Sequence, residues 1–339
     1  MIKIGLLGAG HLGKIHLKLI REIPELELVG FFDQSSQVAD QISKQFDIPA
    51  YASAESLMAD CQAVDVVVPT LAHHGLASLA IEMGKHVFIE KPVTETIEEA
   101  DHLLALSKQN PHLVIQVGHV ERFNPALLAV EEQSIEPIFV EGHRLAMYNP
   151  RGTDVSVILD LMIHDLDVIL SLVPYKVIDI QASGVAVISD TPDIANARLS
   201  FENGCVANLT ASRISMKNMR RLRLFQKDAY LALDFLKKET EWVQLHDQAL
   251  PQTPGLIQFP LDNGSTQRYL RFEKPEVKPS NAIQMELIEF ARAIKGDRQI
   301  RVPLQDGVRA LKVAHRILDE IDRGMQQYQA HQGLLQSHY

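Results

Sequence analysis

The sequence predicts an α/β protein in which a doubly wound parallel sheet is followed by an α+β domain with an open, mostly antiparallel sheet. Two observations lead to this prediction. Short apolar runs alternate with helical patterns over residues 2–118, and such alternation favours a parallel sheet with right-handed crossovers. After about Asn124, strand-like stretches follow one another without regular helices between them, which is typical of antiparallel pairing.

The elements of the first part follow from apolar periodicity and helix-end signals. The Val64–Val68 run is almost continuously β-branched, as in a central strand that is buried on both faces. Pro24 ends the first helix, and Thr96 with Glu99 forms a capping box that begins another. The predicted strands are 2–7, 26–32, 64–68, 86–89 and 113–118, and the two helices are 14–23 and 97–108.

The second part reads as one apolar helix within a series of strands. The predicted strands are 138–145, 177–188, 195–201, 205–212 and 221–235, and the helix is 157–173. Residues 253–279 hold several prolines and are expected to be mostly loop, two helices are expected at 281–294 and 306–323, and the polar end from Gln326 is expected to fray. We place the domains at 1–122 and 123–339, in keeping with 339 residues at roughly 150 per domain.

Composition excludes several classes of protein. The net charge of −10 argues against nucleic acid and anionic membranes as partners, since both attract basic surfaces. No apolar run reaches the roughly 20 residues of a membrane span, and the N-terminus lacks the pattern of a signal peptide, so we expect a cytoplasmic protein. The two cysteines, Cys61 and Cys205, lie outside any zinc spacing and are expected to be buried free thiols; no metal site is expected.

A glycine-rich turn between the first strand and the first helix predicts a dinucleotide site. In Gly8-x-Gly10-x-x-Gly13, the first glycine makes the turn, the second admits a pyrophosphate and the third packs helix on strand. The phosphates would meet the helix N-terminus, with His11 and Leu12 inside the loop. Asp33 ends the second strand at the distance expected for the acid that binds ribose hydroxyls. The alternative is a plain tight turn beside a solvated aspartate.

The residues around this acid favour NAD over NADP. A carboxylate repels a 2′-phosphate, and NADP sites usually offer an arginine instead. Residues 34–37 after Asp33 contain no cation. We therefore expect NAD as the cofactor, with NADP less favoured.

Several further motifs resemble one family. They are the glycine turn extended to His16, Val68-Pro69-Thr70-Leu71-Ala72-His73, Gly84-Lys85-His86-Val87-Phe88-Ile89-Glu90-Lys91-Pro92, and Asp160-x-x-x-His164-x-x-Asp167. Together they resemble the glucose–fructose oxidoreductase/inositol dehydrogenase (Gfo/Idh/MocA) family over essentially the whole chain. The resemblance implies a Rossmann domain, a second domain with an open sheet, and hydride transfer between a sugar or polyol carbon and a nicotinamide cofactor. It also implies a homodimer or homotetramer.

The same resemblance implies roles for individual residues. His164 would be the general acid/base, Lys91 would orient and polarise the substrate, and Asp160 would support the site. The bond between Lys91 and Pro92 would be cis. Cofactor-binding positions implied beyond the glycine loop and Asp33 are Pro69, Thr70, His73, Glu90 and Lys91.

Helical spacing supports this interpretation of the apolar helix. Asp160, His164 and Asp167 are four and three residues apart, so they share one face of an otherwise apolar helix. Such a helix is mostly buried, and its polar stripe is expected to line a cleft. The alternative is a thin solvated face. Asp165 lies off the stripe and is expected to be a cap or packing partner.

The substrate can be narrowed by a departure from the family pattern. Met162 stands where the family often has glycine, and the string 159–167 resembles a subgroup of UDP-N-acetylglucosamine 3-dehydrogenases, as do 118–125 and 151–155. We therefore expect 3-dehydrogenation of a nucleotide sugar, with Arg122 and Arg151 among the substrate-binding residues. Further candidate cations for a diphosphate are Arg144, Arg213, Lys217 and Arg220. The alternatives are a dehydrogenase or reductase of a free sugar, polyol or other small carbonyl compound, and a non-catalytic protein that senses NAD.

Overall fold

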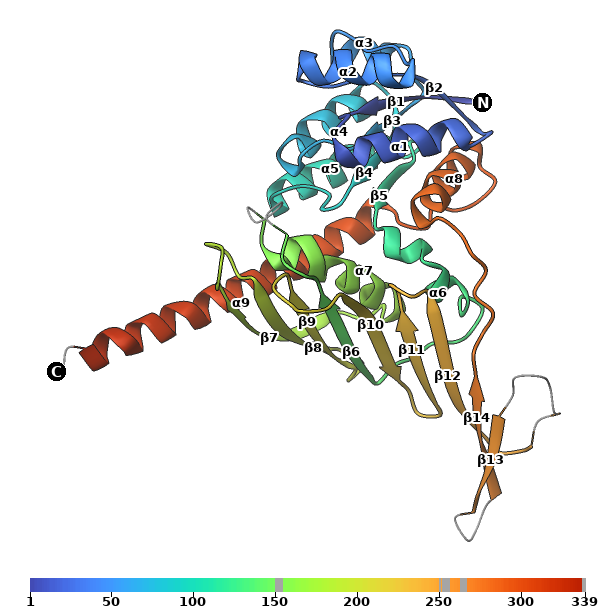
Figure 1. Cartoon of the computed structure of the whole chain (residues 1–339), viewed down its shortest axis with the longest axis vertical. Coiled ribbons are helices and arrows are strands. Elements are labelled where there is room, and N and C mark those ends of the chain that lie inside the picture. Colours follow the sequence, from blue (N-terminus) through green and yellow to red (C-terminus); the bar gives the residue numbers. More distant parts are fainter. Residues whose placement is uncertain (150–154, 250, 252–256, 263–266, 337–339) are drawn as a thin grey trace. The chain divides into compact units, whose positions relative to one another are not determined.

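The computed structural model describes residues 1–149, 155–249, 251, 257–262 and 267–336, which form two compact units (Figure 1). Unit 1 comprises Met1–Phe123 and Ser280–Lys312, and unit 2 comprises Asn124–Pro279 and Val313–Tyr339. The division by sequence placed all of 123–339 in the second domain, whereas residues 280–312 lie in unit 1. The reason is packing, because Leu287 and Phe290 are fully buried in the core of the first sheet.

Unit 1 is built on a five-stranded sheet with the order β2-β1-β3-β4-β5, in which every pair is parallel. Its strands are β1 (Ile2–Leu7), β2 (Leu26–Phe32), β3 (Ala63–Val66), β4 (His86–Glu90) and β5 (Ile115–Gly118). The predicted parallel sheet is thus confirmed. The strand order reverses between β1 and β3, and ligands of doubly wound folds bind at the carboxyl ends of strands beside such a point.

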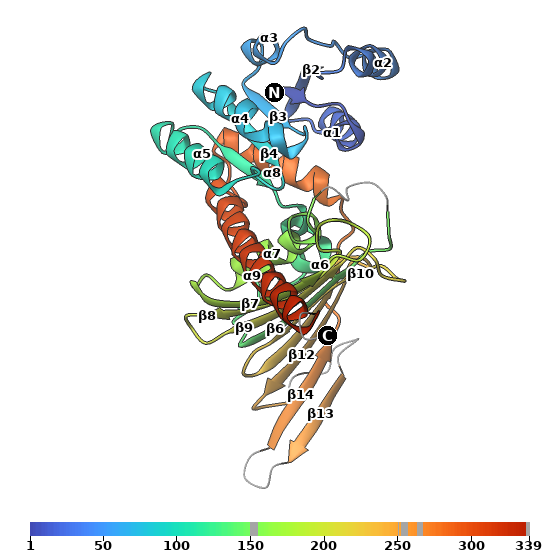
Figure 2. The same cartoon turned by 90° about the vertical axis from the view of Figure 1, so that its left-hand side faces the viewer.

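Helices cover both faces of this sheet (Figure 2). One face carries α1 (His11–Glu22) and α8 (Ala282–Lys295), which pack on each other, and the other carries α4 (His73–Glu82) and α5 (Ile97–Gln109). The capping box of α5 forms as predicted, with Thr96 accepting from Glu99 N and Glu99 accepting from Thr96 N. Shorter elements are α2 (Ser36–Phe46), α3 (Ala54–Ala59) and the 3₁₀ turns η1 (Thr70–Ala72) and η2 (Val120–Phe123).

Unit 2 is built on a nine-stranded sheet with the order β13-β14-β12-β11-β10-β6-β9-β8-β7. All neighbours are antiparallel except β6 and β9, so the mostly antiparallel sheet is confirmed. The strands are β6 (Phe139–Leu145), β7 (Val177–Val185), β8 (Ile194–Phe201), β9 (Val206–Ser212), β10 (Met219–Phe225), β11 (Ala229–Asp234), β12 (Glu239–His246), β13 (Ile257–Asp262) and β14 (Gln267–Glu273).

Among the described residues, helices cover one face of this sheet and leave the other face open (Figure 2). Buried and exposed residues alternate along β6 and β8, as a half-buried strand requires. The covering elements of unit 2 are α6 (Pro125–Leu128), a π-helical stretch (Ile158–Met162), α7 (Ile163–Leu172) and the middle of α9 (Leu304–Gln336), where Ile317 and Ile321 are buried. The open face bears a polar groove of about 630 Å³, lined by residues that include His143, Gln181 and Arg198.

Three predicted elements differ from the structure. The predicted strand 221–235 is a hairpin of β10 and β11, which reverses at Gln226 and Asp228. Residues 253–279 were expected to be mostly loop but include β13 and β14; Pro260 is tolerated because β13 is the sheet edge. The end expected to fray from Gln326 continues as α9 to Gln336.

Two expectations from composition can be compared with the described residues. Cys61 and Cys205 are buried free thiols, and burial raises the pKa of Cys61 to about 12 and that of Cys205 to about 11. Neither thiol is therefore a ready nucleophile at neutral pH. Among the described residues, no helix has both the length and the apolar character that a bilayer span requires.

Candidate active site

The glycine loop that joins β1 to α1 is close-packed, and its geometry explains two of the three glycines. Gly8 has φ +95°, a conformation that residues with a side chain rarely adopt. A Cβ on Gly13 would lie 2.1 Å from the carbonyl oxygen of Gly8, so only glycine lets α1 approach the turn. At Gly10, by contrast, an added Cβ would meet nothing within 4 Å. The loop is therefore closed toward the sheet and open at Gly10.

The N-terminus of α1 is left available to an anion. Its N-cap is Gly10, and among the described residues no side chain caps its first turn. Ser35, Thr96 and Asn281 fill that role for α2, α5 and α8. Backbone N–H groups at an uncapped helix start, with the positive end of the helix dipole behind them, suit a pyrophosphate. The residues of this turn thus fit a dinucleotide.

Asp33 is fixed beside the same turn. Its Oδ2 accepts from the Ala9 N–H at 2.8 Å, and its Oδ1 accepts from the Ser35 N–H at 2.9 Å. Each carboxylate oxygen has a second lone pair, so the side chain is oriented by the loop and can still accept from a ribose diol. This is the position from which Asp33 was predicted to select the cofactor.

The charge of Asp33 leads to the first testable prediction, on cofactor preference. We expect kcat/KM with NAD to exceed that with NADP by about 100-fold, because two unit charges about 4 Å apart near a protein surface repel by roughly 4 kcal/mol before further screening. Asp33→Asn keeps the acceptor for Ala9 and removes the charge, so the ratio should fall below about tenfold. Steady-state kinetics with both cofactors measures this. A wild-type preference for NADP, or an unchanged ratio in the variant, would contradict it.

The loops after β3 and β4 are tied together by His73. Its Nδ1 lies 2.9 Å from the carbonyl oxygen of Pro92 and its Nε2 lies 2.9 Å from that of Val68. Burial lowers the pKa of His73, so the ring is neutral and donates to one carbonyl at a time. The bond between Lys91 and Pro92 is cis, as the family resemblance implied. His73 thus links the segment with Pro69 and Thr70 to the turn that carries Lys91.

Glu90, the last residue of β4, forms part of a buried polar group. Its Oε2 accepts the Lys91 N–H at 3.1 Å, and its Oε1 lies 3.4 Å from His16 Nε2. His16 Nδ1 lies 2.8 Å from Asp65 Oδ2. These partners were missed by sequence analysis, although a signal was there: Asp65 interrupts an apolar strand, where a carboxylate needs a partner.

In unit 2, the predicted polar stripe spans a change of helix type. Asp160 lies in the π-helical stretch, and His164 lies in the first turn of α7. Asp160 and His164 are half-buried, whereas Asp167 is buried. Single π turns inside α-helices are frequent at functional sites. Asp165, off the stripe, pairs with the buried Arg144, whose Nη2 lies 2.6 Å from Asp165 Oδ1.

The candidate cations for a diphosphate fall into different environments. Arg144 and Arg213 are buried and have partners inside unit 2. Arg144 donates to Asp165, and Arg213 donates to the carbonyl oxygen of Val155. Arg122 Nη1 lies 3.4 Å from Asp306 Oδ2 and its Nη2 donates to the Arg301 carbonyl. Lys217 and Arg220 are exposed. Arg151 lies outside the described residues.

The uncapped glycine turn with Asp33 beside it defines a class, the dinucleotide-binding oxidoreductases of the Rossmann fold. Two family models match the chain: "Oxidoreductase family, NAD-binding Rossmann fold" over residues 2–119 and "GFO/IDH/MocA C-terminal domain" over residues 140–231. The chain belongs to the Gfo/Idh/MocA family of oxidoreductases. It is thus an NAD-binding oxidoreductase, as the sequence predicts.

Among curated proteins, the chain is 33% identical over 326 residues to the UDP-N-acetylglucosamine 3-dehydrogenase of Acidithiobacillus ferrooxidans, which covers 96% of this chain and 99% of that one. It is 26% identical over 235 residues to the scyllo-inositol 2-dehydrogenase (NAD⁺) of Bacillus subtilis, covering 63% of this chain and 68% of the other. A solved structure of the Acidithiobacillus enzyme superposes with a TM-score of 0.83 at 32% identity and covers 95% of this chain and 98% of that one. A scyllo-inositol dehydrogenase from Lactobacillus casei, at 21% identity and a TM-score of 0.75 over 96% and 98%, shows the shared fold.

Proposed function

We propose that this oxidoreductase acts on the 3-hydroxyl of a nucleotide sugar, with UDP-N-acetylglucosamine as the first substrate to test. The observation that carries the proposal is the likeness to the Acidithiobacillus enzyme, which extends over nearly the full length of both chains. Inositol dehydrogenases match at lower identity and over a smaller part of this chain. A shared substrate class is better supported by the first likeness than by the second.

The proposed chemistry assigns one step to each of three residues. NAD, when bound, supplies the hydride acceptor for the carbinol carbon. The imidazole of His164 takes the hydroxyl proton as the general base, a role that histidine fills more often than any other side chain. The Lys91 ammonium stabilises the negative charge that develops on the oxygen. Asp160, four residues before His164, is given a supporting role in the site. The same residues serve the reverse reduction.

Binding of the nucleotide part requires cations in an acidic protein. Arg144 and Arg213 are engaged within unit 2, which leaves Arg122, Arg151, Lys217 and Arg220 as the proposed set for the diphosphate. Cations that already have a partner can be shared with a phosphate, because guanidinium has five donors. Because the net charge of the chain is −10, this proposal requires that these cations create a locally positive field at the diphosphate.

The second prediction tests the substrate directly. Formation of NADH is measured with UDP-N-acetylglucosamine, myo-inositol, scyllo-inositol, glucose and free N-acetylglucosamine at matched concentrations. We expect kcat/KM for the UDP-sugar to exceed that for each free compound by at least about 100-fold, since phosphate contacts supply binding energy that the free compounds lack. If an inositol or a free sugar is turned over and the UDP-sugar is not, the proposed substrate is wrong and the protein is a dehydrogenase of a free sugar or polyol.

We also propose a homodimer or homotetramer in the cytoplasm. The open face of the nine-stranded sheet is the surface proposed for assembly, because the described helices of unit 2 leave it uncovered (Figure 2). The two buried free thiols suit a reducing compartment. A solution mass equal to one chain, by sedimentation, would refute the assembly.

A further inference from the structure

Four ionisable side chains meet inside unit 1, away from solvent. His16 comes from α1, Asp65 from β3, Glu90 from β4 and Glu286 from α8. His16, Asp65 and Glu286 are 0% exposed and Glu90 is 8% exposed. Three carboxyl groups around one imidazole cannot all be ionised at low cost in an apolar interior. The contacts among these four side chains must therefore determine which of them carry a proton.

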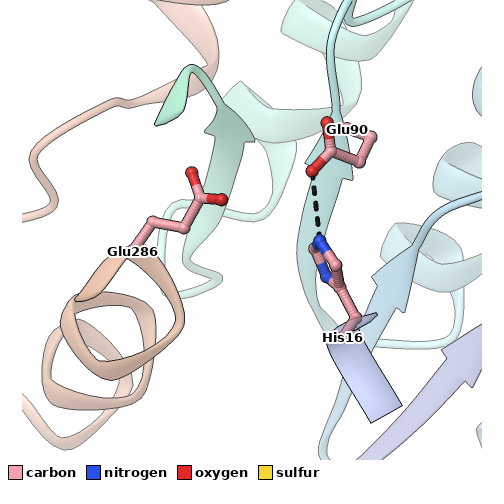
Figure 3. Close-up of side chains that lie close together, drawn as sticks. All are labelled: His16, Glu90 and Glu286. Atoms are coloured by element: carbon pink, nitrogen blue, oxygen red, sulfur yellow. Dashed lines mark ion pairs between the residues drawn. The ribbon is translucent and has the colours of Figure 1, made fainter. Parts of the chain in front are cut away.

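His16 is held between two carboxylates. Its Nδ1 lies 2.8 Å from Asp65 Oδ2. Its Nε2 lies 3.4 Å from Glu90 Oε1, the ion pair that is dashed in Figure 3. Only the protonated ring has an N–H for each of them. Burial opposes the positive charge, but Asp65 and Glu90 together raise the pKa of His16 well above its usual value. His16 is thus a buried cation between Asp65 and Glu90.

Glu286 faces this pair from the other side. Figure 3 shows its side chain extending from α8 toward Glu90 and His16, and its nearest carboxylate oxygen lies within 4.8 Å of the facing atoms of both. Among the described residues, neither of its oxygens has a hydrogen-bond partner, although both are buried. Burial, and then the charge of Glu90, raise the pKa of Glu286 well above its usual value. An ionised carboxylate here would face Glu90 without a donor of its own.

We propose that Glu286 is a neutral acid whose O–H donates a hydrogen bond toward Glu90 through one water, and that Glu286 and His16 together position Glu90 and hence Lys91. Two hydrogen bonds of about 2.8 Å through a water span somewhat less than 5 Å, which suits the separation. Glu90 then accepts from the bridging water and from the Lys91 N–H at 3.1 Å, and it forms an ion pair with His16 at 3.4 Å. His16 and Glu286 act through Glu90 and are positioning residues. This inference rests on the role proposed for Lys91.

The neighbouring charges leave this assignment in place. Lys91 adds a cation next to Glu90, and the 3₁₀ turn η2, which packs on α8, adds Glu121 and Arg122. Arg122 pairs with Asp306. His119 is buried, and burial with the charges of Arg122 and Lys91 lowers its pKa to about 3, so it is neutral.

On α8 itself, the next acid along the chain has a different environment. Glu289 pairs with Arg292 and Arg298. Glu286 has no such cation from its own helix among the described residues. Protonation is therefore the simplest way to remove the negative charge of Glu286. The alternative occupant is a divalent cation held by His16, Glu90 and Glu286, whose three facing atoms lie within 4.8 Å of one another.

The test compares two replacements of Glu286. Glu286→Gln keeps the shape and an N–H donor toward Glu90, whereas Glu286→Leu removes the donor. We expect Leu to lower kcat by about tenfold with KM for the substrate nearly unchanged, because Lys91 is displaced slightly. Glutamine should restore most of that loss. If glutamine is as impaired as leucine, the neutral-acid assignment is wrong.

Two readouts need no substrate and stay valid if the proposed substrate is wrong. The infrared spectrum of the wild type at pH 7 should show a protonated-carboxyl carbonyl band that Glu286→Gln lacks. The folded state holds protons on Glu286 and His16 that the unfolded chain releases, so wild-type stability should fall as pH rises from 7 to 9. Below pH 7 the buried neutral His73 and His119 act in the opposite direction, because the unfolded chain protonates them there. Urea midpoints should show this fall weakened in Glu286→Gln, because the contribution of Glu286 is removed while that of His16 remains. An absent band, an equal fall in both proteins, or one equivalent of chelator-resistant metal in the wild type would overturn the proposal.

Discussion

Replacing Lys91 with alanine is expected to lower kcat by about 10²- to 10³-fold, the cost of removing one group that stabilises a developing oxyanion. The charge of the ammonium is used mainly in the transition state, because the substrate hydroxyl is neutral before the reaction. KM for the sugar should therefore change less than kcat. Initial rates of NADH formation measure both parameters. Retention of the circular dichroism spectrum and melting temperature distinguishes this loss from unfolding.

A matched lysine provides the control for this prediction. Lys44, near the end of α2, is exposed, and its replacement with alanine should leave kcat unchanged. His164→Ala tests the proposed partner residue in unit 2, and general-base catalysis is typically worth about 10²- to 10⁴-fold. Near-normal turnover in both Lys91→Ala and His164→Ala would show that neither residue takes part in the chemistry.

Local sequence signals were enough to predict the dinucleotide loop. The spacing of the glycines and Asp33 reflects contacts within one strand–turn–helix–strand segment, and the hydrogen bond from Ala9 to Asp33 is such a contact. The cis bond before Pro92 was reached through the resemblance and not through any local rule. The parallel and antiparallel sheets were predicted because the alternation of strands with helices ends near Asn124, after which strand-like stretches follow one another.

Contacts between distant segments could not be predicted. Nothing in the apolar pattern of 281–294 shows that this helix packs on the first sheet, yet its Glu286 completes the group around His16. The edge strand β13 was missed because Pro260 indicates a loop unless the strand is known to be at an edge. Likewise, the sequence presents Arg144 as a cation like the others, and only its burial against Asp165 shows a structural role.

Breaking the pair of Arg144 and Asp165 is expected to have the largest effect on stability. Arg144 on β6 and Asp165 on α7 are each 2% exposed, and Arg144 Nε and Nη2 both donate to Asp165 Oδ1, at 3.1 and 2.6 Å. Arg144→Leu leaves a buried carboxylate without these donors, which typically costs about 3–5 kcal/mol. We expect the free energy of unfolding, from urea titrations monitored by circular dichroism, to fall by that amount.

The double variant Arg144→Leu/Asp165→Leu separates loss of the pair from loss of packing. Replacing both partners of a buried ion pair by apolar side chains is often nearly neutral, so the double variant should be more stable than Arg144→Leu. The pair of Arg221 and Glu241 is the surface comparison, with both side chains 43% exposed and an N–O distance of 3.7 Å. Arg221→Ala should cost no more than about 1 kcal/mol. Equal losses for Arg144→Leu and Arg221→Ala would mean that burial does not govern the strength of the link between β6 and α7.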